Sequence, residues 1–115
     1  MASPKRLTRT ADLELVRREG KRVRTALLEV RVLASLLHAH RIGVVVPRFG
    51  HTAVARNQLK RRLRELARHE WTPRLAALAP HDVLLRAGPA AYHADFAALT
   101  SDMRRLGDRL VQGAA

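Results

Sequence analysis

Positively charged side chains recur at helical spacing in the segment 56–68, which reads Arg-Asn-Gln-Leu-Lys-Arg-Arg-Leu-Arg-Glu-Leu-Ala-Arg. Arg56, Lys60 and Arg64 lie four residues apart, so a helix would place them along one side. Six of these thirteen residues are cationic and only Glu65 is acidic. Because like charges at this spacing repel by about 0.2–0.5 kcal/mol per pair, the pattern favours contact with a polyanion, and nucleic acid is the first candidate. Three polar residues adjoin the row: Asn57, Arg61 and Arg68.

The charge of the whole chain supports the same interpretation. The formal net charge is +12 over 115 residues and the sequence pI is near 11.8, in the range of nucleic-acid-binding domains. Only Lys5, Lys21 and Lys60 are lysine, and arginine suits bidentate contacts to phosphate. A genome rich in guanine and cytosine would produce the same arginine bias, so the placement of the cations carries more weight than their type. A charged face that only aids solubility is the alternative for the segment 56–68.

The sequence offers little for enzymatic chemistry. We find no nucleophile motif, no phosphate-binding glycine loop and no paired carboxylates, so no catalytic residue is expected. The six histidines are scattered, and His38 and His40 have no carboxylate or cysteine at ligand spacing. We therefore expect no metal site on the protein. His51 lies beside the basic segment, where contact with phosphate is one alternative to a surface loop position.

Length and composition predict one domain over residues 1–115, with residues 1–10 as a flexible basic arm. There is no cysteine, so neither a disulfide framework nor a thiolate zinc site can form. The first ten residues lack the apolar stretch of a signal peptide, and the longest apolar runs are too short to span a bilayer. We therefore expect a cytoplasmic protein with no membrane partner.

Three helices are predicted from apolar periodicity. The first begins at Thr10 and stops at Gly20, and the last spans Ala94 to Val111 with Phe96 opening its apolar stripe. The basic helix starts after Thr52, a possible N-cap, and is broken at Thr72-Pro73, with Trp71 covering its end. The residues expected to press this helix onto the core are Ala55, Leu59, Leu63 and Leu66.

Strands are predicted at Leu27–Ala34, Arg41–Val46 and Asp82–Ala87. In the first of them, residues 28, 30 and 32 lie on one side and Glu29 and Arg31 on the other. The order of elements is therefore a helix, two or three strands, the basic helix, a strand and a final helix. This order defines the α+β class.

The segment 53–65, Ala-Val-Ala-Arg-Asn-Gln-Leu-Lys-Arg-Arg-Leu-Arg-Glu, resembles the signature of the bacterial ribonuclease P protein component family. The resemblance extends over nearly the whole chain. Leu7 to Gly20 is similar to the opening helix of the family, and Arg41 to Val46 to the strand before the signature. Asp82 to Ala87 resembles the strand that follows it, and Phe96 to Leu110 the closing helix.

The resemblance implies a fold of order α-β-β-β-α-β-α, with a central mixed sheet and a left-handed βαβ crossover, shared with a ribosomal protein domain. It also implies a role as the non-catalytic protein subunit of a ribonucleoprotein. In that assembly a catalytic RNA, with bound Mg²⁺, removes the 5′ leader from precursor tRNA. The implied partners are the catalytic RNA and precursor tRNA, and the protein by itself is expected to be a monomer.

By match to the signature, the resemblance assigns RNA contact to Arg56, Asn57, Lys60, Arg61 and Arg64. Arg68 continues the same cationic face, and Arg48 occupies a position that the family often fills with lysine. A cleft between the first helix and the sheet is expected to hold the leader. The chain departs from the family pattern in that Gln58 replaces a usual arginine and the aromatic positions of the cleft differ. The residues expected in this cleft are Leu13, Leu28 and Arg31.

Two other classes of function compete with this interpretation. The cationic stripe alone would suit a general RNA- or DNA-binding protein, such as a ribosomal or nucleoid protein. A helix-turn-helix is disfavoured because a break and a strand follow the basic helix. A stand-alone nuclease is disfavoured because the sequence lacks the carboxylate cluster of two-metal catalysis.

Overall fold

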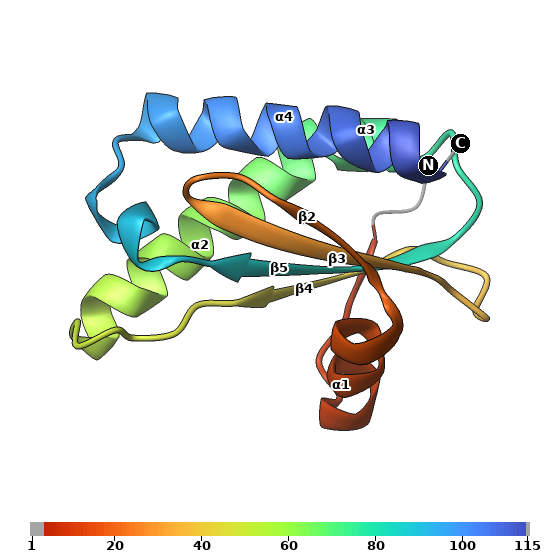
Figure 1. Cartoon of the computed structure of the whole chain (residues 1–115), viewed down its shortest axis with the longest axis horizontal. Coiled ribbons are helices and arrows are strands. Elements are labelled where there is room, and N and C mark those ends of the chain that lie inside the picture. Colours follow the sequence, from red (N-terminus) through yellow and green to blue (C-terminus); the bar gives the residue numbers. More distant parts are fainter. Residues whose placement is uncertain (1–3, 115) are drawn as a thin grey trace.

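A five-stranded mixed sheet organises the computed structural model, which describes residues 4–114 (Figure 1). The strand order is β1-β4-β5-β3-β2, with β4 parallel to both β1 and β5 and the remaining pairs antiparallel. The parallel neighbours β4 and β5 are joined by a helical crossover, as the sequence predicts. The strands are β1 (Lys5–Arg6), β2 (Lys21–Arg24), β3 (Leu28–Ala34), β4 (Arg41–Val45) and β5 (His81–Ala87).

Helices cover both faces of this sheet. The helix α1 crosses one face, and α2 and α4 lie on the other (Figure 1). This arrangement confirms the predicted α+β class, with β1, a short helix after α2 and a 3₁₀ turn in addition to the expected elements. The helical elements are α1 (Thr10–Glu19), α2 (Ala53–Glu70), α3 (Thr72–Leu75), η1 (Pro89–His93) and α4 (Phe96–Ala114).

Alternation along the strands decides which side chains meet which helices. In β3, Leu28 and Val30 face the main core beneath α2 and α4, whereas Glu29 and Arg31 point toward the α1 face. A smaller apolar cluster of Leu7, Val16 and Leu84 attaches α1 to its face. The sheet is therefore buried fully on one side and only partly on the other, which leaves room for a groove beside α1.

The basic helix forms as its sequence predicts. The Thr52 hydroxyl accepts a hydrogen bond from the Ala55 N–H at 3.1 Å, which satisfies one free donor of the first turn. Leu59, Leu63 and Leu66 are buried at 5%, 0% and 4% exposure. The apolar stripe therefore lies against the core, and the cationic residues are left toward solvent.

Of two aromatic residues considered in the sequence, one lies where expected and one does not. Trp71 is the C-cap residue of α2, at the helix end as expected, and it is fully buried with its Nε1 donating to the Met103 carbonyl oxygen at 2.8 Å. The predicted break at Thr72-Pro73 is confirmed, because α2 ends at Glu70. A separate short helix, α3, follows, and it accommodates Pro73 because proline is tolerated in the first turn of a helix. Phe96 is 59% exposed rather than part of the core. It is the first residue of α4, where the chain has not yet come over the sheet.

Part of the segment expected to be a flexible basic arm, residues 1–10, is instead held against the sheet. Lys5 and Arg6 form β1, which pairs with Arg41 and Ile42 of β4, and Leu7 is buried at 2% exposure. The Leu7 N–H donates to the Ile42 carbonyl oxygen at 3.0 Å. Burial of one leucine and the sheet hydrogen bonds hold this segment in place. Residues 1–3 of the expected arm lie outside the described residues.

Candidate nucleic-acid interface

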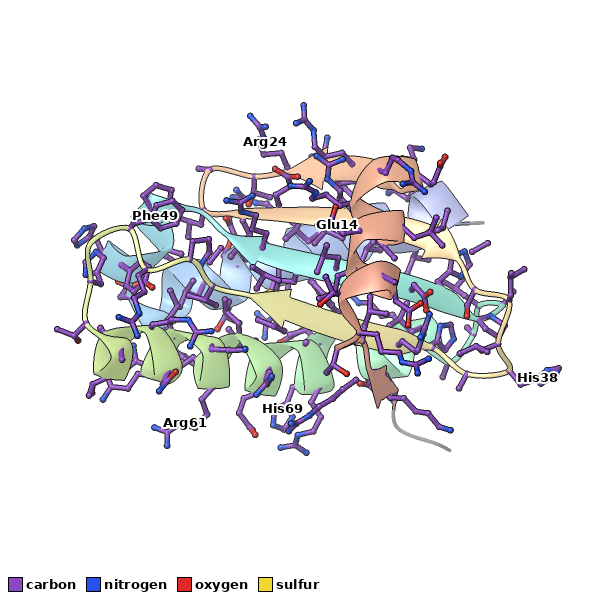
Figure 2. The ribbon with its side chains drawn as sticks, turned by 90° about the horizontal axis from the view of Figure 1, so that it is seen from below. Glu14, Arg24, His38, Phe49, Arg61 and His69 are labelled. Carbon is purple, nitrogen blue, oxygen red and sulfur yellow. The ribbon has the colours of Figure 1, made fainter. Side chains whose placement is uncertain are left out.

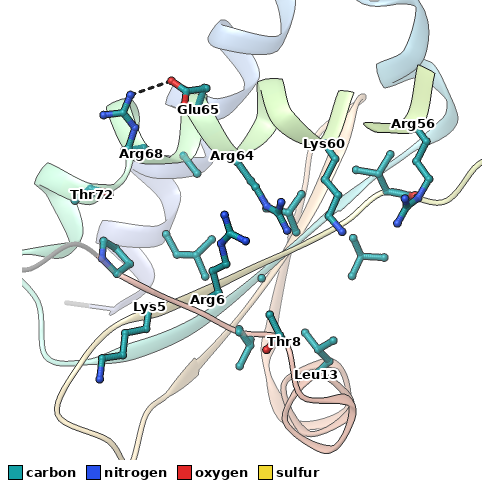
Figure 3. Close-up of a pocket in the computed structure, with 18 of the residues that line it drawn as sticks. Lys5, Arg6, Thr8, Leu13, Arg56, Lys60, Arg64, Glu65, Arg68 and Thr72 are labelled. Atoms are coloured by element: carbon teal, nitrogen blue, oxygen red, sulfur yellow. Dashed lines mark hydrogen bonds and ion pairs between the residues drawn. The ribbon is translucent and has the colours of Figure 1, made fainter. Parts of the chain in front are cut away.

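A groove of about 660 Å³ lies between α2 and the segment formed by β1 and the start of α1 (Figure 3). Its floor is apolar and includes Leu7, Ile42, Val44 and Val46, with Leu13 of α1 on the far wall. Its rim is cationic. The basic residues that line it are Lys5, Arg6, Arg56, Lys60, Arg64 and Arg68.

Arg56, Lys60 and Arg64 project from α2 over this groove, each of them half-buried (Figure 3). Arg56 Nε donates to the Val46 carbonyl oxygen at 3.0 Å, and its Nη1 donates to Asn57 Oδ1 at 3.0 Å. Within residues 4–114, none of these three side chains forms a salt bridge with a carboxylate. Their charges are therefore available to an external anion.

The charged groups in the groove act on one another. Burial lowers the pKa of Lys60 from its ordinary value, and the positive charges of nearby arginines lower it further. The pKa of Arg64 is lowered in the same way, by burial and then by the charges of Arg6 and Arg56. Both shifts mean that burial and neighbouring positive charge disfavour the charged forms of these side chains, a cost that an anion beside them would offset.

Arg6 is a groove residue that the sequence analysis missed. Its positive charge lowers the pKa of Lys60 and of Arg64, which lie more than fifty residues further along the chain. The three side chains are close because β1 pairs with β4, beside α2. Figure 3 shows its guanidinium extending into the groove toward Arg64. A two-residue strand carries no periodicity of its own, so the alternation that reveals longer strands could not locate it.

The other predicted contacts of α2 lie at the edge of the groove or outside it. Asn57, Arg61 and Arg68 are exposed, and Arg61 points away from the sheet (Figure 2). Arg68 lines the groove, where its Nη2 donates to Glu65 Oε2 at 2.9 Å. That hydrogen bond, together with the charge of Arg68, lowers the pKa of Glu65. Arg48 is exposed in the loop that precedes α2.

The three residues expected in a leader cleft do not share one site. Leu13 lines the groove described above. Leu28 is 2% exposed within the main core on the opposite face of the sheet, so its assignment to a leader-facing cleft is wrong. Arg31 lies on the α1 face in a separate hollow of about 390 Å³, where its Nε donates to Glu29 Oε1 at 2.9 Å and its Nη1 to the Arg17 carbonyl oxygen at 2.6 Å.

An ion-pair network ties α1 to the sheet. Arg41 of β4 donates to both oxygens of Asp82 at 2.8 and 2.7 Å, and to Asp12 of α1 at 3.0 Å. The hydrogen bond to Asp82 raises the pKa of Arg41, and Asp12 adds to this effect against the cost of burial. Asp82 is only 5% exposed, which makes this a partly buried bidentate pair.

The histidines considered in the sequence have other surroundings. His40 Nδ1 accepts the His81 backbone N–H at 3.1 Å, while His38 is exposed. The His51 ring stacks on Tyr92, with centroids 3.9 Å apart. Across residues 4–114, no three His, Cys, Asp or Glu side chains cluster closely enough to hold a metal ion. No helix within this range has the length and apolar character needed to cross a bilayer.

The fold and the groove together define a small α+β domain with a cationic groove beside its basic helix. The Ribonuclease P family model matches residues 1–111 of this chain. The chain is 37% identical over 118 residues to the Ribonuclease P protein component of Streptomyces bikiniensis, covering 94% of this chain and 93% of that protein. It is 40% identical over 87 residues to the same component of Syntrophobacter fumaroxidans, covering 75% and 71%.

Solved structures of RNase P proteins have the same fold. The Staphylococcus aureus protein aligns with a TM-score of 0.79 at 19% identity, covering 91% of this chain and 94% of that one. The Thermotoga maritima protein aligns with a TM-score of 0.76 at 24% identity, covering 91% and 96%. The chain therefore belongs to the ribonuclease P protein family. Its function is that of a subunit in tRNA processing.

Proposed function

We propose that the α2 groove binds the catalytic RNA of ribonuclease P and that the protein thereby assists removal of the 5′ leader from precursor tRNA. The observation that carries this proposal is the row of Arg56, Lys60 and Arg64, half-buried around one groove without carboxylate partners among the described residues. A polyribonucleotide supplies phosphates at the spacing and number that such a row can neutralise. The proposed RNA contacts are Arg48, Arg56, Asn57, Lys60, Arg61, Arg64 and Arg68.

The proposal assigns the chemistry of cleavage to the RNA and not to this chain. Glu65 is the carboxylate that lines the groove within the described residues, and its Oε2 accepts a hydrogen bond from Arg68. The remaining lining side chains are cationic, apolar or hydroxyl groups. The protein therefore binds and orients, and the Mg²⁺ needed for cleavage is held mainly by the partner RNA.

The contribution that we propose for the protein is to reduce electrostatic repulsion within the assembly. A catalytic RNA and precursor tRNA repel each other as polyanions, and a small cation-rich protein between them lowers this repulsion. The assembly then needs less Mg²⁺ for folding and for substrate binding. We further propose that Leu13 and the apolar floor of the groove contact bases of the leader, since this part of the lining is uncharged.

A cleavage assay tests the proposal directly. Precursor tRNA is incubated with the protein alone, with the catalytic RNA alone at low Mg²⁺, and with both together. We expect stimulation only in the mixture. Cleavage by the protein alone would contradict the assignment of chemistry to the RNA, and equal rates with and without the protein would leave a general RNA-binding protein. In keeping with this role, the proposed location is the cytoplasm and the free protein is proposed to be a monomer.

A further inference from the structure

Phe49 lies on the surface beyond the carboxyl end of β4 in a backbone conformation that phenylalanine rarely adopts. Its φ is +47°, in the left-handed region, and 44% of the residue is exposed. This conformation costs free energy for any residue with a Cβ atom, and an exposed ring recovers little of that cost by burial. Such an outlier points to a function of the ring itself.

The loop that carries Phe49 is held rigidly. The Tyr92 hydroxyl donates to the Pro47 carbonyl oxygen at 2.7 Å, which ties the loop to η1. The Phe49 ring meets the Tyr92 ring edge-on at a centroid distance of 6.5 Å, and the His51 ring stacks on the face of the same Tyr92 ring at 3.9 Å. The ring is thus positioned before any ligand arrives, which lowers the entropy cost of binding.

Cations surround the exposed ring. A hollow of about 300 Å³ separates Phe49 from the turn between β2 and β3, and Arg24 and Arg86 also line it. Glu29 is the acidic residue among the described lining of this hollow, and its carboxylate pairs with Arg31 at 2.9 Å and with Arg24 at 3.7 Å. Arg86 forms no salt bridge among the described residues. Arg48 is exposed next to Phe49 in the chain. An aromatic face among arginines is the arrangement that stacks a nucleobase and holds its phosphates.

The loop that carries Phe49 begins at one end of the cationic groove. Pro47 lines one end of the groove, where Arg56 Nε also donates to the Val46 carbonyl oxygen, and Phe49 follows two residues later. Figure 2 shows Phe49 at the end of the sheet opposite His38, on the side where α1 leaves the face uncovered. An RNA strand that leaves the groove at Pro47 would have Phe49 two residues further along this loop.

We propose that Phe49 stacks on one unpaired base of a single-stranded RNA segment, and that Arg48 and Arg86 contact the flanking phosphates. The inference rests on the proposed function and adds a base-stacking contact to it.

The test uses the full chain and single-stranded RNA oligonucleotides that carry 2-aminopurine at successive positions. Phe49→Tyr and Phe49→Trp keep an aromatic face, whereas Phe49→Leu keeps only apolar volume. Phe49→Gly removes the ring and suits a positive φ. We expect fluorescence quenching at one position with the wild type and the two aromatic variants. The leucine and glycine variants should lose that quenching and bind roughly 5- to 150-fold more weakly.

The stability of the glycine variant separates recognition from a structural role. We expect its Tm to equal or exceed that of the wild type, because the strained backbone is relieved. A lower Tm with unchanged RNA affinity would overturn the inference, and so would wild-type affinity and quenching in Phe49→Leu. Loss of self-association in Phe49→Leu with intact RNA binding would also overturn it, since the ring would then contact a second copy. The proposed function would survive these outcomes and fails only if the wild type does not bind RNA.

Discussion

The surroundings of Lys60 lower the pKa of its ammonium group. Burial, Arg64 and Arg56 all lower its pKa, so the charged form is less favourable in the folded protein than in water. The same residue is proposed to contact RNA, where its charge is useful. Functional sites often contain residues that favour binding but lower the stability of the fold. A substitution at Lys60 can therefore change RNA affinity and stability in opposite directions.

Replacing Lys60 with methionine should stabilise the protein and weaken RNA binding. Methionine keeps the unbranched chain and removes the repulsion from neighbouring cations, so Tm should rise by about 1–4 °C. Loss of a charged hydrogen bond to phosphate should lower the affinity for RNA about tenfold or more. Thermal unfolding and fluorescence anisotropy measure the two effects. A fall in both stability and affinity would show that Lys60 has a structural role instead.

The lowered pKa of Lys60 also predicts a pH dependence. Because its pKa is below the ordinary value in the folded state, the charged residue reduces stability at neutral pH. That reduction disappears as the pH rises through the folded pKa toward the unfolded value near about 10.4. Bound phosphate favours the charged form, so affinity should decline over the same window. Lys60→Arg should keep its affinity there, and an equal decline in both proteins would contradict this account.

At the level of elements, α1 depends on the network of Arg41, Asp82 and Asp12 for its place over the sheet. Asp82→Asn should lower the free energy of unfolding by about 3 kcal/mol, because Arg41 would remain partly buried with only one carboxylate. Asp12→Asn should cost roughly 1 kcal/mol, because Asp12 is more exposed. Urea denaturation measures both, and losses of equal size would argue against a buried bidentate pair.

Elements whose pattern lies within one segment could be predicted from the sequence. The cationic and apolar stripes of α2 and its Thr52 cap each depend on residues a few positions apart. The pairing of β1 with β4 joins residues about 36 positions apart through two residues, so no local pattern signals it. The position of Trp71 depends equally on a distant partner, the Met103 carbonyl group of α4.

The error at Leu28 has a different origin. Its alternation with Arg31 was evident in the sequence, and it places the two residues on opposite faces of β3. Two residues on opposite faces of one strand cannot line the same cleft. Alternation shows which residues share a face, but the face that α1 covers depends on the tertiary fold. Only the structure placed Leu28 under α4 and left Arg31 beside α1.

For the whole molecule, the question is how many of its cations act on one RNA strand. The molecule measures 36 × 29 × 24 Å, and charges are screened over about 8 Å at physiological salt. Cations on distant faces therefore contribute little to a strand in the groove. Several of them are also neutralised within the protein, as in the pairs Arg74–Asp108 and Arg104–Glu70.

Counting only the groove predicts the salt dependence of binding. Five lining cations, Lys5, Arg6, Arg56, Lys60 and Arg64, form no salt bridge with a carboxylate in the described part of the chain. Five neutralised phosphates give a slope of log K against log salt concentration of roughly −3.5 on a single strand, and roughly −4.5 on a duplex. A short single-stranded RNA is the appropriate probe, because it cannot reach the other faces. A slope near zero would contradict the electrostatic basis of binding.

Arg6 and Arg62 provide a matched comparison for this slope. Both are exposed arginines, but Arg6 lines the groove and Arg62 of α2 lies outside it. Arg6→Ala should reduce the magnitude of the slope by about 0.7–0.9, whereas Arg62→Ala should leave it unchanged. Thermal unfolding of both variants controls for damage to β1. Equal changes in slope would mean that the net charge of the molecule, and not the position of its groove cations, governs binding.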